Sequence, residues 1–159
     1  MHDADKRDPQ ATARDPQAVA EAAARDFLTH DRSTFGFFGF ALAGIGPGCA
    51  TIQFTVGAQH LNSAGVCHGG IVFALADSAL GSASCSHGIQ ALAQHADIHW
   101  LKPARAGDVL IATASEVSRA GRTAVYDVAV TKSDGELVAT LRGMTRSTGL
   151  AVGAGLEQK

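Results

Sequence analysis

The chain has 159 residues, 46% of them hydrophobic and 18% charged, with a formal net charge of −2. This length suffices for one domain with a buried core, and the small net charge gives no reason to expect a nucleic-acid partner. No segment approaches the roughly 20 apolar residues of a membrane span, and the N-terminus lacks the apolar stretch of a signal peptide. Three cysteines without a paired spacing favour reduced thiols. We therefore expect a cytoplasmic protein with no membrane partner.

Two flexible tails are predicted on either side of a single domain. Residues 1–16 are polar, and Arg-Asp-Pro-Gln occurs at 7–10 and again at 14–17, a biased composition that does not build a core. We assign the domain to residues 17–149 and a second tail to residues 150–159.

An N-terminal helix and two strands are predicted before residue 60. Asp15 and Pro16 suit a helix start, and apolar residues follow them at helical spacing. The aromatic, glycine-rich segment after this helix predicts a strand near residues 37–45, which Gly-Pro-Gly ends. Apolar and polar residues then alternate over residues 49–56, which is typical of a half-buried strand.

A long helix from about Gly69 to Ser86 is predicted next, followed by further strands. These strands cover residues 92–101, 108–118, 123–131 and 136–146. Their connections are too short for parallel crossovers, so we expect an antiparallel meander. The predicted fold class is α+β, with an antiparallel sheet of five to six strands packed on one long helix, plus the N-terminal helix.

The long helix contains the residues with the clearest chemical potential. Asp77 lies within an apolar run, where a carboxylate is costly unless it is paired or used. It offers a nucleophile or a general base for water. Gly69 and Gly70 begin the helix, where unpaired N–H groups and the helix dipole suit a developing oxyanion. The side-chain amide of Asn62 can orient a water molecule or a substrate carbonyl.

The spacing of Gly69 and Asp77 indicates that two chains share each site. Eight helical residues separate them by roughly 12 Å, whereas an attacking group and an oxyanion donor must both lie about 3 Å from the reacting atom. Two antiparallel copies of the helix place Asp77 of one chain beside Gly69 of the other. We therefore predict a symmetric homodimer.

Several short motifs together resemble the hotdog-fold acyl-CoA thioesterases, most closely the PaaI group of phenylacetic acid degradation. They are Leu61-Asn62, Cys67-His68-Gly69-Gly70, Leu75-Ala76-Asp77, Trp100-Leu101-Lys102-Pro103-Ala104 and Gly107-Asp108. The resemblance implies a sheet wrapped around a central helix and hydrolysis of small aryl-acyl-CoA thioesters such as phenylacetyl-CoA or hydroxyphenylacetyl-CoA. It also implies a homotetramer built from two dimers, and no metal or cofactor beyond the coenzyme A of the substrate.

The resemblance also implies roles for individual residues. The N–H of Gly69 polarises the thioester carbonyl, and Asp77 of the partner subunit attacks it directly or through water. Asn62 lies near the thioester and the attacking water. His68 assists positioning or the leaving thiolate. Some relatives place a serine or threonine on the strand after the helix, but this sequence has Ala93, Gln94 and His95 in that region, so the role has no candidate.

Basic residues beside two predicted turns are candidates for binding the phosphates of coenzyme A. Arg119 and Arg122 flank one turn, and Lys102 and Arg105 lie by the preceding turn. Arginine suits phosphate through its bidentate fork. Ordinary solvated turn charges are the alternative for each of them. Gly70 completes the predicted substrate-binding set.

Two other functions remain open at this point. The chain can be an acyl-CoA-binding hotdog protein without turnover, or a hotdog enoyl-CoA hydratase or dehydratase. A zinc site is disfavoured, because Cys67-His68 and Cys85-Ser86-His87 lie at opposite helix ends roughly 25 Å apart.

Overall fold

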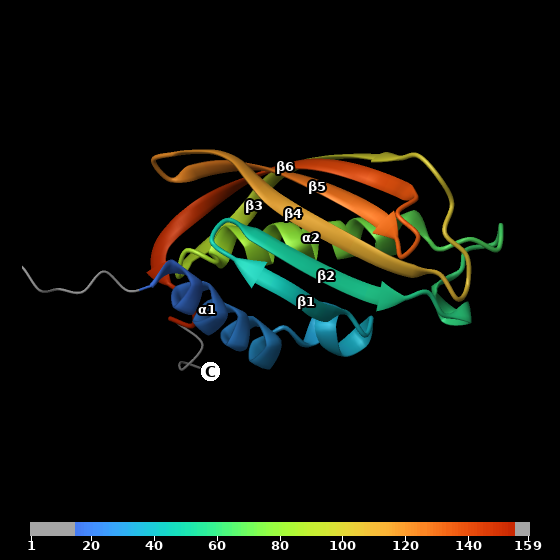
Figure 1. Cartoon of the computed structure of the whole chain (residues 1–159), viewed down its shortest axis with the longest axis horizontal. Helices are drawn as coiled ribbons and strands as arrows, with labels where there is room; N and C mark the ends of the chain where they lie inside the picture. The colour runs from blue at the N-terminus through green and yellow to red at the C-terminus, as the bar shows by residue number, and fades with distance from the viewer. Residues whose placement is uncertain (1–14, 155–159) are drawn as a thin grey trace, which may run out of the picture.

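The computed structural model describes residues 15–154, which form a curved antiparallel sheet around one long helix (Figure 1). The helices are α1 (Pro16–His30) and α2 (Gly69–Cys85), and the strands are β1 (Ala41–Gly46), β2 (Cys49–Thr55), β3 (Ile89–Trp100), β4 (Val109–Ala120), β5 (Thr123–Lys132) and β6 (Leu137–Ala151). The predicted α+β class and the single long helix are confirmed. Neither described helix is long and apolar enough to cross a membrane.

The order of strands in the sheet is β1-β2-β4-β5-β6-β3, and every neighbouring pair is antiparallel. Strands β4, β5 and β6 form the predicted meander through turns at Gly121 and Gly135, both with positive φ. The prediction is wrong for β3, which pairs with β6 instead of β4. The connection of residues 101–108 is long enough to carry the chain past the intervening strands. Within residues 15–154, no strand covers the other edge of β3.

The core lies between one side of α2 and the inner face of the sheet. Leu75, Ala76, Ala79 and Leu80 of this helix are completely buried. Removing such leucine surface from water contributes about 1.5–3 kcal/mol per side chain. The helix packs closely over Gly143 of β6, where an added Cβ would lie only 2.6 Å from a methyl group of Leu80. Any larger residue at position 143 would force the buried Leu80 side chain to move.

The start of the first strand and the C-terminal end of the domain differ from the predicted ones. The first strand begins only at Ala41, because a π-helix over Arg32–Phe37 occupies the aromatic segment before it. Strand β6 continues to Ala151, and the Val152 N–H donates to the Gly88 carbonyl at 3.0 Å. The fold thus extends past the boundary predicted at residue 149. The tail residues 1–14 and 155–159 lie outside the described residues.

Candidate active site

The first turn of α2 contains one backbone donor without a partner. His68 caps this helix: its Nδ1 accepts the Gly70 N–H at 3.0 Å, and its carbonyl accepts the Ile71 N–H at 2.9 Å. The N–H of Gly69 makes no hydrogen bond to another residue in 15–154. Since the helix dipole adds partial positive charge here, this N–H can stabilise an oxyanion.

Asn62 orders the loop that leads into this helix. Its Oδ1 accepts the Ala64 N–H at 2.9 Å, and its own N–H donates to the Val66 carbonyl at 2.8 Å. The loop is tied to the helix start because the His68 N–H donates to the His60 carbonyl at 2.8 Å. The carbonyl side of the Asn62 amide is therefore occupied by the loop. The NH₂ group is the part of this side chain that can reach a water molecule or a substrate.

Asp77 carries a half-buried carboxylate that no other described residue pairs with by a hydrogen bond or an ion pair. Desolvation by burial raises the pKa of this carboxyl above its ordinary value. No neighbour in the described part of the chain therefore pairs with this carboxylate. Asp77 and Gly69 lie on one helix, roughly 12 Å apart, so a single chain does not bring them to one reacting atom.

The side of α2 that faces away from the sheet is only partly covered. The residues on this side are Gly70, Ile71, Phe73, Ala74, Asp77, Ser78 and Gly81. Asp77 lies in the middle of this series. No described residue contacts a Cβ built on Gly81 within 4 Å. Apart from Asp77 and Ser78 the face is apolar, and the small residues Gly70, Ala74 and Gly81 make it suitable for close packing against a second helix.

The basic residues do not form one cluster in a single chain. Arg119 and Arg122 line a cavity of about 230 Å³ beside Ser84 and His87, at the C-terminal end of α2. Arg122 donates from Nε to the Ser147 carbonyl at 2.9 Å, which leaves its terminal nitrogens available. Lys102 lies near the opposite helix end. It forms an ion pair with Glu136 at 2.7 Å and is therefore partly neutralised.

Two further residues that were not predicted from the sequence lie near α2, one at each end of the helix. The Trp100 indole N–H donates to the Gly69 carbonyl at 3.2 Å. Thr145 of β6 pairs with Ala93 of β3, so the two side chains share a face of the sheet. Thr145 is only 2% exposed, lines the 230 Å³ cavity and makes no side-chain hydrogen bond to another described residue. Strand β3 has no serine or threonine at Ala93, and the hydroxyl of Thr145 lies on the neighbouring strand β6. Only strand pairing could have revealed it.

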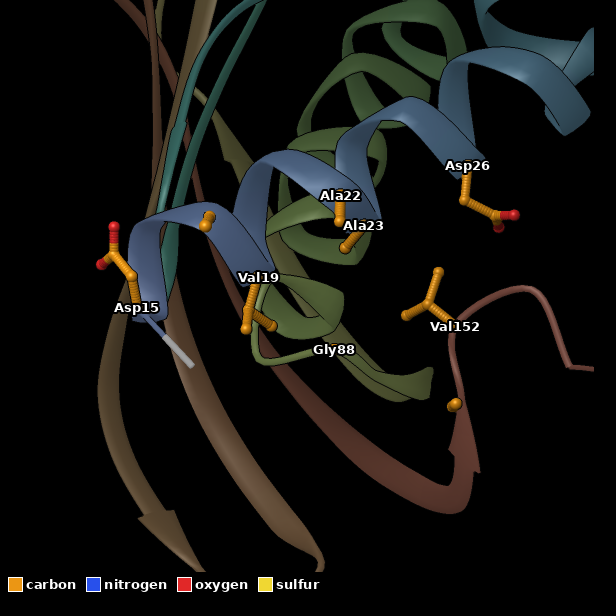
Figure 2. Close-up of a pocket in the computed structure, with 9 residues that line it drawn as sticks. Asp15, Val19, Ala22, Ala23, Asp26, Gly88 and Val152 are labelled. Atoms are coloured by element: carbon orange, nitrogen blue, oxygen red, sulfur yellow. The ribbon is translucent and has the colours of Figure 1, made fainter. Parts of the chain in front are cut away.

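A second cavity, of about 520 Å³, lies between α1 and the end of β6. Figure 2 shows Val19, Ala22 and Ala23 of the helix on one side, with Gly88 and Val152 opposite. Its lining is mostly small and apolar, and it contains none of the predicted site residues. Among residues 15–154, no three histidine, cysteine or acidic side chains lie close enough to hold a metal ion.

Comparisons with known proteins show the family to which the chain belongs. The family model of the thioesterase superfamily matches residues 64–139. The acyl-coenzyme A thioesterase PaaI of Escherichia coli K12 is 38% identical over 111 residues, which cover 70% of this chain and 79% of that protein. The chain belongs to the thioesterase superfamily. It is a thioesterase of the PaaI type.

Solved structures place this thioesterase in the hotdog fold, as the sequence predicts. The structure of E. coli PaaI superposes with a TM-score of 0.83 at 33% identity, covering 86% of this chain and 99% of that one. A Streptococcus mutans protein, smu.793, bound to acetyl-CoA superposes with a TM-score of 0.68 at 30% identity, covering 70% and 90% of the two chains. The helix α2 therefore corresponds to the central helix around which the hotdog sheet wraps.

Proposed function

We propose that this thioesterase hydrolyses small aryl-acyl-CoA thioesters, such as phenylacetyl-CoA or hydroxyphenylacetyl-CoA, in cytoplasmic aromatic catabolism. The observation that carries the proposal is a matched pair of unused groups on α2: the free N–H of Gly69 and the unpaired carboxylate of Asp77. An oxyanion donor and a desolvated carboxylate are what thioester hydrolysis requires. Relatives solved with acetyl-CoA and with coenzyme A support this class of substrate.

The active site is proposed to form between two chains. The open edge of β3 offers unpaired backbone groups to a second copy. Side-by-side pairing of two such edges about a two-fold axis is antiparallel, and it brings the uncovered faces of the two α2 helices together. Asp77 of the partner subunit then lies near Gly69, Asn62 and His68 of the first chain. Two such dimers form the proposed homotetramer.

The reaction begins when the thioester carbonyl oxygen accepts the Gly69 N–H. Asp77 of the partner subunit either removes a proton from water, whose oxygen then bonds to the carbonyl carbon, or attacks that carbon itself. The C–S bond breaks as the tetrahedral intermediate collapses, and the thiolate of coenzyme A leaves. Direct attack gives a mixed anhydride that water hydrolyses in a second step. No step requires a metal or a further cofactor.

The roles of His68 and Asn62 follow from their observed bonds. His68 Nδ1 accepts a backbone N–H, so the proton of the neutral ring is on Nε2, where it can be donated to the departing sulfur. The free NH₂ of Asn62 holds the substrate oxygen or the attacking water.

An aromatic acyl group is supported by the rings near the loop. Phe38 stacks on Phe40, with 5.3 Å between their ring centroids. The Phe40 and Phe54 centroids lie 5.0 Å apart, and those of Phe54 and His60 lie 5.3 Å apart. Phe40 and Phe54 are buried and belong to the core, while Phe37 is 82% exposed. Aromatic pairs of this kind favour another ring as a neighbour. We propose that Phe37 and Phe38 contribute to the acyl pocket.

A thiol-release assay with a panel of acyl-CoA esters tests this function. Phenylacetyl-CoA and hydroxyphenylacetyl-CoA are expected to give a higher kcat/KM than acetyl-CoA and long-chain acyl-CoA. Equal rates on all esters would contradict the aryl preference alone. Tight binding of the esters without thiol release would identify an acyl-CoA-binding protein. Loss of enoyl absorbance from an enoyl-CoA, without release of thiol, would identify a hydratase.

A further inference from the structure

The peptide group between Gly69 and Gly70 is held from both sides. The Gly69 carbonyl oxygen accepts the indole N–H of Trp100 at 3.2 Å, and the Gly70 N–H donates to Nδ1 of His68 at 3.0 Å. One side chain comes from the last residue of β3 and the other from the residue before α2. The first two residues of the helix are therefore fixed to the end of the edge strand as well as to their own cap.

The Trp100 ring also closes the space over Gly69. A Cβ built on Gly69 would lie 3.2 Å from the indole nitrogen and 3.4 Å from the adjoining ring carbon. These are tighter than ordinary contacts, so any other residue at position 69 would push the indole away or tilt the helix start. Gly69 and Trp100 thus fit each other across 31 positions of the sequence.

We propose that Trp100 is a positioning residue of the thioesterase: its hydrogen bond to the Gly69 carbonyl holds the 69–70 peptide, and the helical backbone at Gly69 that this secures sets the direction of the Gly69 N–H in the preceding peptide. This inference rests on the proposed function, in which that N–H stabilises the oxyanion. The Gly70 and Ile71 N–H groups are already bonded within the cap, so Gly69 supplies the free donor of this turn. Preorganised donors act only when aimed at the developing charge, and a 1 Å displacement can lower rates by about 10²-fold.

Trp100 acts on the transition state in this account, and not on substrate affinity. Its loss is therefore expected to lower kcat and leave KM nearly unchanged. Trp100→Phe keeps an aromatic ring and removes the N–H donor. Replacing Trp100 by 3-benzothienylalanine keeps the bicyclic shape and exchanges the N–H for sulfur, so it separates the hydrogen bond from packing. Leu101→Ala is the matched control, because Leu101 is the adjacent residue and both side chains are 54% exposed.

Steady-state kinetics on the best acyl-CoA ester are measured for these proteins, with circular dichroism and size-exclusion chromatography on each. Both Trp100 variants are expected to lose about tenfold in kcat and to keep a KM within threefold of wild type. The Leu101→Ala protein is expected to keep the kcat and KM of wild type. The benzothienylalanine protein decides the matter if Trp100→Phe misfolds. A kcat within twofold of wild type in the folded benzothienylalanine protein overturns the positioning role and leaves the thioesterase proposal standing. A rise in KM alone also overturns it.

Two further readouts separate this inference from the function on which it depends. A wild-type protein that releases no thiol from any ester refutes the proposed function, and the positioning role is refuted with it. Selective ¹⁵N-glycine labelling is expected to show a displaced Gly69 amide resonance in the benzothienylalanine protein and not in Leu101→Ala. An unmoved Gly69 resonance overturns the proposal.

Discussion

Nδ1 of His68 accepts the N–H of Gly70 at 3.0 Å, so one ring nitrogen caps α2 and the other faces away from the cap. His68→Asn is expected to keep the cap, because asparagine is among the best N-cap residues, and to lose the Nε2 donor. His68→Ala loses both the helix cap and the Nε2 donor, and it is expected to lower the free energy of unfolding by about 1 kcal/mol. Urea titration and kinetics are measured on both. Full activity in His68→Asn would show that the ring does not take part in the reaction.

Removing the carboxylate of Asp77 is expected to abolish most hydrolysis while the fold is retained. A general base contributes roughly 10²- to 10⁴-fold, so Asp77→Ala and Asp77→Asn are expected to lose at least this much in kcat. Asp97→Asn is the matched control, since Asp97 is an exposed carboxylate on β3. Near-normal turnover by either Asp77 variant would rule out the mechanism.

Burial of Asp77 also predicts how stability changes with pH. Because its pKa is raised in the folded chain, its contribution to stability is fully present below the unfolded pKa of about 3.9. That contribution is lost as the pH rises through the folded pKa. Asp77→Asn is therefore expected to have a higher Tm than wild type at pH 7, with a smaller difference near pH 4. A lower Tm at pH 7 would indicate that the carboxylate has a stabilising partner.

Mixed dimers test whether each site uses two chains. Asp77→Ala and Asn62→Ala proteins are each expected to be nearly inactive, and a heterodimer retains one intact site. Random exchange of equal amounts yields about half heterodimers, so activity is expected to recover to about a quarter of wild type. Exchange is followed by mass spectrometry of differently tagged chains. No recovery after proven exchange would place both residues in one chain's site.

Arg122 is expected to bind the nucleotide part of the substrate. Arg122→Gln should raise KM for an acyl-CoA about tenfold, a loss typical of one charge-assisted contact to phosphate. The same change should have no effect on the corresponding acyl N-acetylcysteamine thioester, which has no phosphate. Arg25→Gln, an exposed position on α1, is the control. An equal effect on both thioesters would assign Arg122 a structural role.

Local patterns in the sequence were sufficient for most of the helices and strands, and they singled out Gly69 and Asp77 as the predicted site residues. The observed α2 begins at the predicted Gly69 and ends at Cys85, one residue before the predicted end. Gly121 and Gly135, which have positive φ, predicted the turns between β4 and β5 and between β5 and β6. These features depend on neighbours a few positions away, which is why periodicity and glycine placement reveal them. The spacing of Gly69 and Asp77 along one helix likewise followed from helix geometry alone.

Only the tertiary structure decided which distant segments meet. The pairing of β3 with β6 leaves one β3 edge open and sets Thr145 opposite Ala93. The same pairing carries Trp100 to the start of α2, where its indole binds Gly69. Strand neighbours are selected by the summed packing of the whole sheet on the helix, and no local pattern encodes that sum. The sequence thus determined the chemical groups of this thioesterase, and the fold determined what holds them in place.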